Sequence, residues 1–190
     1  MRPTRAEMEA ARDRLVPDVL GDDLRVLFCG INPGLWTAAT GYHFARPGNR
    51  FWPALHASGF TPRCFRPDEQ SELTALGFGI TNVVARPTAR ADELTAEEYA
   101  AGGRILAAKV ARHRPRWLAV AGVTAYRAAF ADRRAAVGPQ SGTLGDTRIW
   151  VLPSPSGLNA HWSAAALAAE FARLREAAGA PELPGAGLTA

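Results

Sequence analysis

The side chain best placed to do chemistry in this chain is the amide of Asn32, within Gly30-Ile31-Asn32-Pro33-Gly34. This segment follows an apolar run, residues 26–29, that is typical of a buried strand. Pro33 biases Asn32 toward an extended backbone, and the flanking glycines permit a turn. The amide would therefore be held in a constrained position, where it could orient water or a polar ligand. Taken alone, the segment is more typical of an ordinary strand end with an Asn-Pro turn than of a site.

Two more polar segments follow apolar stretches. Asn82 lies within the apolar stretch 78–84, and residues 153–159 read Pro-Ser-Pro-Ser-Gly-Leu-Asn. A buried amide without a partner costs about 1–3 kcal/mol, so Asn82 is either a satisfied core amide or a ligand-reading group. Leu158 either packs on the core or is exposed as a wedge. Ligands bind at the carboxyl ends of strands in open α/β sheets, so these segments predict one shared site.

Strand and helix patterns alternate along the chain. Strands are predicted at 25–30, 78–84, 117–121 and 148–152. Helices are predicted at 5–15, 50–58, 124–130 and 163–178. A further helix is predicted from Thr95, which begins a Thr-x-x-Glu capping box, to near Pro115. Such alternation predicts an α/β fold, a single-domain three-layer sandwich around a central, mostly parallel four-stranded sheet. We expect an N-terminal helical extension over 1–20, the domain over 21–178 and a mobile tail over 179–190.

Composition narrows the class of protein. The chain has 190 residues, 22 Lys plus Arg against 18 Asp plus Glu, and a net charge of +4. The charge permits a polyanionic partner, although an arginine-rich codon bias would give the same composition. Cys29 and Cys64 lack metal-ligand spacing and are expected to be reduced. No stretch has the length and apolarity of a membrane span, and the amino terminus is polar, so we expect a cytoplasmic protein without membrane partners.

Several segments together resemble a known family. Gly30-Ile31-Asn32-Pro33-Gly34, residues 40–52, Gly79-Ile80-Thr81-Asn82 and Pro155-Ser156-Gly157-Leu158 occur in the order seen in mismatch-specific uracil-DNA glycosylases and thymine-DNA glycosylases, within the uracil-DNA glycosylase superfamily. The resemblance covers about residues 24–175. It implies a bacterial, monomeric DNA glycosylase with a uracil-DNA glycosylase-like fold. Its partner would be double-stranded DNA with a mispaired or damaged pyrimidine, and it would use no cofactor or metal.

The resemblance also implies roles for individual residues. Asn32 would position the attacking water, Phe44 would stack on the flipped base beside Ile31, and Asn82 would read the base's polar edge. Leu158 would fill the gap that the flipped nucleotide leaves. The expected DNA-binding residues are Thr37, Ser154, Ser156, Gly157, Leu158 and Asn159.

The resemblance bears on specificity and chemistry as well. Gly34 replaces the tyrosine of stricter relatives, which predicts a pocket that admits ethenocytosine and other modified pyrimidines. An amide is no base, so slow turnover is expected.

Asp92 or Glu93 is a candidate assisting carboxylate, although surface charge and helix capping explain both. Lys109, the only lysine, is far from the motifs in sequence, which predicts no strand-nicking step and an abasic product.

Some positions depart from relatives and leave alternatives open. Ser154 stands where some members have asparagine, and Asn159-Ala160-His161 replaces a segment that carries an arginine, so contacts to the opposite strand stay open. His161 is either a DNA contact or an exposed cap of the last helix. Two rival functions remain: a non-catalytic module that binds damaged bases, and a small-molecule nucleoside hydrolase.

Overall fold

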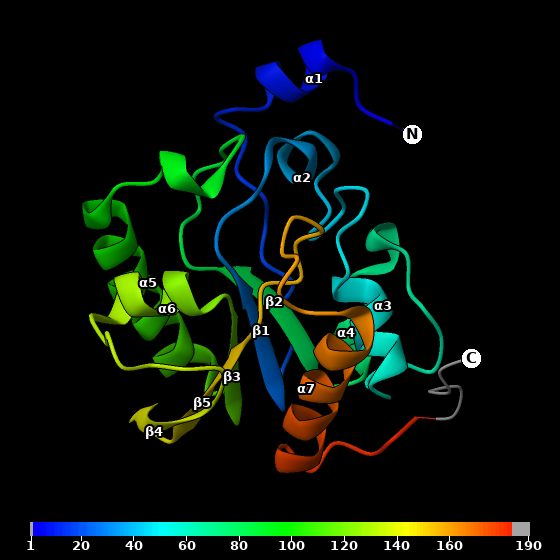
Figure 1. The fold of residues 1–190 in the computed structure, drawn as a ribbon, viewed down its shortest axis with the longest axis vertical. Helices are drawn as coiled ribbons and strands as arrows, with labels where there is room; N and C mark the ends of the chain where they lie inside the picture. Colours follow the sequence, from blue (N-terminus) through cyan, green and yellow to red (C-terminus); the bar gives the residue numbers. More distant parts are fainter. Residues whose placement is uncertain (1, 184–190) are drawn as a thin grey trace.

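A five-stranded sheet forms the centre of the protein in a computed structural model that describes residues 2–183 (Figure 1). Its strand order is β2-β1-β3-β5-β4. The strands are β1 (Val26–Gly30), β2 (Phe78–Asn82), β3 (Trp117–Ala121), β4 (Gly138–Leu144) and β5 (Thr147–Leu152). β2, β1, β3 and β5 are parallel, as predicted, and β4 pairs antiparallel with β5 at the edge. Four strands were expected, and β4 is the additional one.

Helices cover both faces of the sheet, which confirms the three-layer α/β sandwich (Figure 1). One layer holds α3 (Phe51–Ala57), α4 (Glu72–Ala75) and α7 (Ala164–Ala177), and the other holds α5 (Ala96–His113) and α6 (Val123–Phe130). β1 alternates between the two layers: Phe28 packs with Phe171, and Cys29 lies in the cluster that contains Leu106. A strand buried on both faces needs no polar alternation, which explains its continuous apolar run.

Local sequence signals set several helix ends. Thr95 and Glu98 form the predicted capping box at the start of α5. α1 (Arg5–Ala10) is shorter than the predicted helix over 5–15, while α2 (Leu35–Thr40) lies in a segment expected to be a loop. Ser163 caps α7 through its side chain, so the prediction that His161 caps this helix is wrong. Two short 3₁₀ helices, η1 (Pro67–Glu69) and η2 (Ala91–Glu93), complete the elements.

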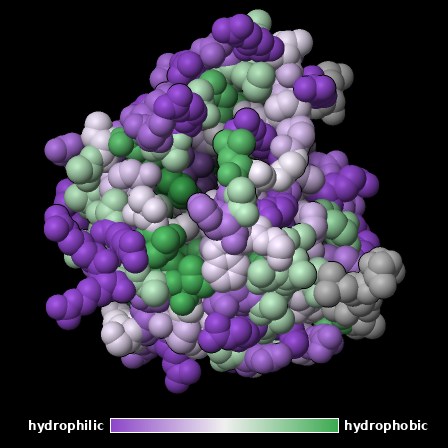
Figure 2. Space-filling model, in the orientation of Figure 1, coloured by the Kyte–Doolittle hydropathy of each residue, from purple (hydrophilic) through white to green (hydrophobic). Residues whose placement is uncertain are grey.

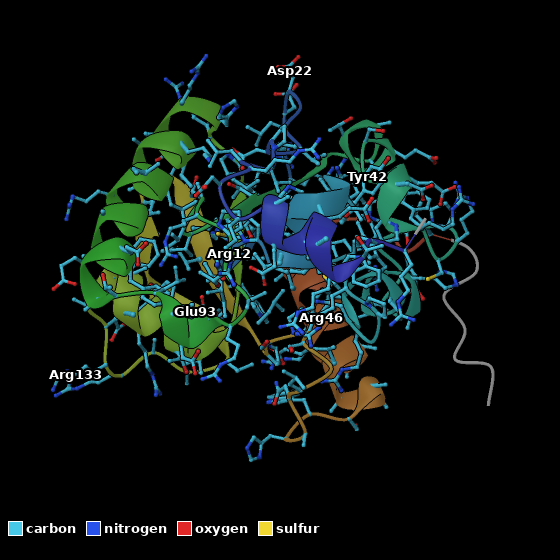
Figure 3. All side chains as sticks on the ribbon, turned by 90° about the horizontal axis from the view of Figure 1, so that it is seen from above. Arg12, Asp22, Tyr42, Arg46, Glu93 and Arg133 are labelled. Atoms are coloured by element: carbon cyan, nitrogen blue, oxygen red, sulfur yellow. The ribbon has the colours of Figure 1, made fainter. Side chains whose placement is uncertain are left out.

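Both ends of the described chain pack against the domain. α1 lies above the carboxyl ends of the strands next to α2, and Figure 3 looks down on it from that side. At the other end, Ala180 is buried and the Leu183 amide donates to the Gly59 carbonyl at 3.1 Å. Within the expected mobile tail, Ala180 and Leu183 therefore contact the domain, and residues 184–190 lie outside the described residues. Between residues 2 and 183, no helix is long and apolar enough to cross a membrane.

Candidate active site

The loops that follow β1, β2 and β5 line one cavity of about 560 Å³ together with the segment before α3. Parallel pairing places Gly30 opposite Asn82, so the turn after β1 and the end of β2 meet. The predicted site residues that line this cavity are Ile31, Asn32, Gly34, Thr37, Phe44, Asn82, Asp92, Ser154, Ser156, Leu158 and Asn159. Gly157 is the one predicted site residue that does not line it.

The amide of Asn32 is fixed by two hydrogen bonds. Its Nδ2 donates to the Arg86 carbonyl at 2.9 Å and to the Thr88 hydroxyl at 2.8 Å. Arg86 is itself held by an ion pair with Glu98, whose pKa is lowered to about 2 by that guanidinium. Both amide hydrogens are thus used, and Oδ1 has no partner among the described residues. The oxygen can accept a hydrogen bond from a water molecule without any rearrangement of the side chain.

Phe44 forms an aromatic platform in the cavity. Its ring stacks on Phe51 with centroids 3.9 Å apart and planes at 19°. The Phe44 backbone has φ +54°, a left-handed conformation that is uncommon for an aromatic residue, and the neighbouring His43 carbonyl accepts from Trp52 Nε1 at 3.1 Å. Phe51 therefore covers one face of the Phe44 ring, and Phe44 also lines the cavity. Such a platform suits a flat heterocycle.

Asn82 is half-buried at the end of β2 and is held in place by two neighbours. Its Nδ2 lies 3.4 Å from Nδ1 of His43. A Cβ added to Gly30 would lie 2.6 Å from its Oδ1, so only glycine at position 30 leaves room for this amide. Asn82 thus has features of both a satisfied core amide and a ligand-reading group, because one donor is satisfied inside the protein and the residue still lines the cavity.

Leu158 is 80% exposed, at the tip of a loop with internal hydrogen bonds. Asn159 Nδ2 donates to the Ser154 carbonyl at 3.0 Å, and the Leu158 amide donates to the Ser156 hydroxyl at 3.3 Å. A Cβ on Gly157 would come within 2.5 Å of the Gly48 carbonyl, so this glycine lets the loop approach the segment before α3. The loop therefore presents an apolar side chain to solvent from a defined backbone. Figure 2 shows apolar groups at several places on one face of the molecule, among hydrophilic ones.

Arg50 ties the loop to the aromatic platform. Its guanidinium donates to the carbonyls of Ser156, Asn159 and Trp162, and its backbone amide donates to the Pro155 carbonyl at 2.9 Å. Arg50 also immediately precedes Phe51, the partner of Phe44. One side chain thus sets the position of the loop relative to the platform.

Replacing Arg50 by methionine is expected to lower the free energy of unfolding by about 2–4 kcal/mol, because it leaves three loop carbonyls without their donor. Urea denaturation measures the change. Arg133→Met is the control, since Arg133 is exposed and forms no ion pair within residues 2–183; its effect should stay within about 0.5 kcal/mol. Equal stability of the two variants would show that Arg50 does not hold the loop.

Burial or hydrogen bonds limit the roles of three predicted residues. Thr37 is 6% exposed, which leaves little surface for a phosphate contact. Asp92 pairs with Arg90, and this hydrogen bond lowers the pKa of the carboxyl. Glu93 accepts from the Arg90 amide at 2.9 Å and so caps η2. Asp92 is the carboxylate that lines the cavity, and it is ionised at neutral pH.

Lys109 is far from the motifs in sequence but near them in space. Its Nζ contacts the Asp18 carboxylate at 2.5 Å and the hydroxyl of Thr81, the residue before Asn82, at 2.7 Å. Its distance from the motifs along the sequence therefore does not carry over to the fold, because Lys109 on α5 reaches Thr81 on β2. The amine is nonetheless engaged by both groups and does not line the cavity.

Sequence reasoning assigned no role to four residues that organise the site. They are His43, Arg50, Arg86 and Thr88. His43 and Arg50 lie inside the motif 40–52, so the motif itself could have drawn attention to them. Arg86 acts through its backbone carbonyl, which no residue type reveals.

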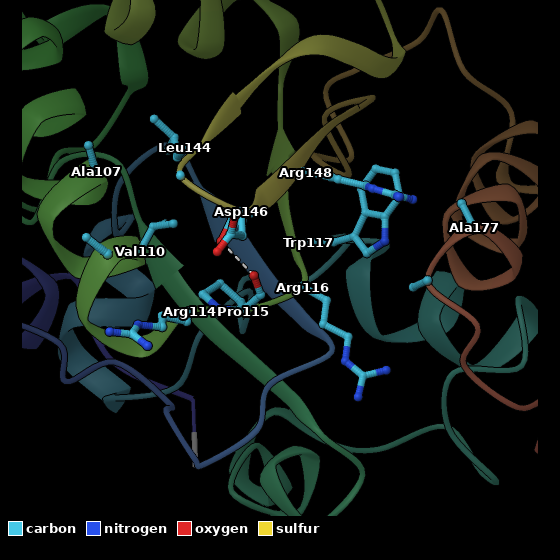
Figure 4. Close-up of a pocket in the computed structure, with 14 residues that line it drawn as sticks. Ala107, Val110, Arg114, Pro115, Arg116, Trp117, Leu144, Asp146, Arg148 and Ala177 are labelled. Atoms are coloured by element: carbon cyan, nitrogen blue, oxygen red, sulfur yellow. Dashed lines mark hydrogen bonds between the residues drawn. The ribbon is translucent and has the colours of Figure 1, made fainter.

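A second cavity, of about 970 Å³, lies at the amino ends of the strands, opposite the candidate site. It is formed by the end of α5, the start of β3 and the β4–β5 turn (Figure 4). Arg114, Arg116 and Arg148 line it, and it includes none of the predicted site residues. Across the part of the chain that the structure describes, no group of three or more His, Cys, Asp or Glu side chains could hold a metal ion.

The fold and cavity define an α/β protein in which the Phe44 ring, the Asn82 amide and the fixed Asn32 amide line one cavity. The family model of the Uracil DNA glycosylase superfamily matches residues 17–178, and the chain belongs to this family of hydrolases that act on N-glycosyl bonds. A solution structure from Methanosarcina acetivorans, provisionally assigned as a uracil DNA glycosylase, is similar at 20% identity and a TM-score of 0.57. The alignment covers 86% of this chain and 98% of that one. At this identity the likeness shows the fold alone.

Proposed function

We propose that this protein is a monofunctional, mismatch-specific DNA glycosylase. It flips uracil out of a G-mispaired duplex and hydrolyses the N-glycosidic bond, leaving an abasic site for base excision repair. The observation that carries the proposal is the Asn32 amide, whose two donors are occupied and whose acceptor oxygen is free, in the same cavity as the Phe44 platform. The other supports are the exposed Leu158 and the family membership.

Flipping is the first step that the geometry serves. Extruding a nucleotide costs a few kcal/mol of unstacking, least for a mispaired base. Leu158 inserts between base steps to offset that cost, while Phe44 stacks on the extruded base. Because Arg50 joins the two segments, wedge and platform act at a fixed separation.

Bond cleavage then depends on positioning. Positive charge develops on the sugar as the base leaves, and Asn32 Oδ1 orients the water that attacks the anomeric carbon. An amide cannot take the water's proton, so the rate depends on how good a leaving group the base is. We propose that turnover is slow and that activated pyrimidines leave fastest.

Asp92 assists, in this proposal, as a negative charge near the developing cation. Arg90 neutralises much of that charge, and the carboxylate is solvent-exposed, so Asp92→Asn should slow single-turnover excision measurably but by less than about tenfold. Wild-type rates in this variant would remove Asp92 from the mechanism. A loss as large as that of an Asn32 variant would make Asp92 the principal catalytic group instead.

The turn at Gly34 bears on which bases enter. A Cβ built on Gly34 meets no heavy atom within 4 Å, so this wall of the cavity has unfilled space beside it. We propose that 5-substituted pyrimidines and ethenocytosine are accepted there. Discrimination against normal bases then comes from the weaker pairing of the lesion in the duplex.

The absence of a strand-nicking step is proposed on the engagement of Lys109. Nicking through a Schiff base needs a free amine at the sugar, whereas this ammonium is bound by Asp18 and Thr81. We infer that the product is an intact strand with an abasic site.

One assay separates this function from its rivals. The protein is incubated with a duplex that holds a single G·U pair, and the DNA is then treated with alkali. Breakage that requires alkali supports the glycosylase, whereas tight binding without breakage indicates a non-catalytic module that holds damaged bases. Cleavage of free uridine alone indicates a nucleoside hydrolase.

A further inference from the structure

The ring of His43 lies between a backbone carbonyl and the base-reading amide. His43 is 1% exposed, its Nε2 lies 2.9 Å from the Pro17 carbonyl, and its Nδ1 lies 3.4 Å from Asn82 Nδ2. A carbonyl oxygen can only accept a hydrogen bond, so Nε2 must carry a hydrogen. In a neutral ring, Nδ1 is then an acceptor.

Burial keeps the ring neutral. It lowers the pKa of His43 below its ordinary value near 6.5; the hydrogen bond to the Pro17 carbonyl and the charge of Asp18 oppose this and raise the pKa, while Lys109 lowers it further. At neutral pH, Asn82 must therefore turn its NH₂ group toward His43. Its Oδ1 then lies over Gly30, where the missing Cβ leaves space.

The orientation of that amide decides which base can pair with it. A freely rotating amide matches uracil, through the N3 hydrogen and a carbonyl, and matches cytosine equally well, through the amino group and N3. An amide held in one orientation matches only the first. In the same pose, cytosine would bring donor against donor and acceptor against acceptor.

A network beneath β2 holds Pro17 in place. The Asp18 carboxylate accepts from Lys109 Nζ and from the Thr81 hydroxyl at 2.7 Å, and Lys109 also donates to that hydroxyl. Next to it, Val19 exchanges two backbone hydrogen bonds with Ile80, each 2.8 Å. The Pro17 carbonyl is thus fixed relative to the strand that ends in Asn82.

We propose that His43 is a positioning residue that holds the Asn82 amide in the orientation matching a base with an N3 hydrogen and a neighbouring carbonyl, and that the ion pair of Asp18 and Lys109 holds His43 through Pro17. The selectivity of the site for uracil-type bases over unmodified cytosine follows from this arrangement. Ethenocytosine has no N3 hydrogen, so it would gain no pairing from this amide and would depend on stacking on Phe44 and on the space beside Gly34. The inference rests on the proposed function, because it assigns the base-reading role to Asn82.

The test compares excision of 5-fluorouracil and 5-fluorocytosine, each opposite thymine, by the wild type and by His43→Gln. For each protein, the rate for 5-fluorouracil is divided by the rate for 5-fluorocytosine. Comparing this ratio between the wild type and the variant cancels differences between the two bases in leaving group and in flipping. Releasing the amide should lower this ratio by roughly 5- to 150-fold, the equivalent of about 1–3 kcal/mol for one bidentate base contact. Lys109→Met should lower it by a smaller factor, and thermal melting verifies that both variants fold.

A role confined to folding predicts a different result, because both rates would then fall together and the ratio would stay constant. The pH profile adds a second criterion. Protonation makes Nδ1 a donor and turns Asn82 over, so the wild-type ratio should be constant from pH 8 to about 6.5 and fall only in more acid solution, while that of His43→Gln stays flat. An unchanged ratio in the variant overturns the proposal.

Nitrogen-15 spectra of the histidine rings in the free protein separate the two levels of inference. They should show the Nε2-protonated neutral tautomer for His43, and an Nδ1-protonated ring would overturn the proposal whatever the activity. If the wild type excises neither fluorinated base and releases no uracil from a G·U duplex, the proposed function fails, and the spectra still decide whether His43 holds the amide.

Discussion

Alanine in place of Asn32 is expected to slow the release of uracil from a G·U duplex by at least about 10²-fold, since even a small misplacement of a reacting group costs that much. The variant removes the Asn32 Oδ1 acceptor, which belongs to an amide whose Nδ2 is fixed by two hydrogen bonds. Duplex binding should be nearly unchanged, because Phe44 and Leu158 are intact. Single-turnover kinetics and a parallel binding measurement check both expectations.

Thr88→Val is the matched control for Asn32. It keeps the shape of the side chain but removes one of the two acceptors of the Asn32 amide. The expected loss is roughly 3- to 10-fold, the equivalent of one hydrogen bond of about 0.5–1.5 kcal/mol. If Asn32→Ala retained full activity, water positioning by this amide would be excluded.

Leu158→Ala is expected to slow excision from the G·U duplex by roughly 10- to 100-fold, because the wedge loses about 1.5–3 kcal/mol of apolar burial between the base steps. The free energy of unfolding should change by less than about 0.5 kcal/mol, since the side chain is 80% exposed. The combination of lost activity and unchanged stability identifies a residue that works only against DNA.

Leu15→Ala serves as the comparison for the wedge. Leu15 is also a large exposed apolar residue, at 68% exposure, but it lies outside the candidate site. Its replacement should leave excision unchanged. Equal effects of the two variants would mean that Leu158 acts as a general surface residue rather than as a wedge.

Much of the fold follows from local patterns in the sequence. The apolar runs of β1, β2, β3 and β5 and the capping box at Thr95 depend on neighbouring residues alone. β4 was missed because Gly-Pro-Gln-Ser-Gly-Thr-Leu lacks an apolar alternation; it forms by pairing with β5, and its middle residues are exposed.

The candidate site is predictable to a similar degree. Residue types at strand ends drew attention to Asn32 and Asn82, and parallel pairing brings them to one edge. The supporting contacts are long-range: Arg50 reaches residues more than 100 positions away, and Asn32 is fixed partly by a backbone carbonyl. The engagement of Lys109 likewise depends on how α5 packs over β2. Contacts of this kind leave no pattern in a single sequence.

Release of free uracil from a G·U duplex is the measurement that tests the central claim most directly. The protein is held in excess over the duplex, and uracil and the intact strand are quantified by mass spectrometry without alkali. The account predicts uracil and an unbroken abasic strand in equal amounts, formed faster from G·U than from A·U pairs. Binding of the G·U duplex with no uracil released, or a strand broken without alkali, would contradict it.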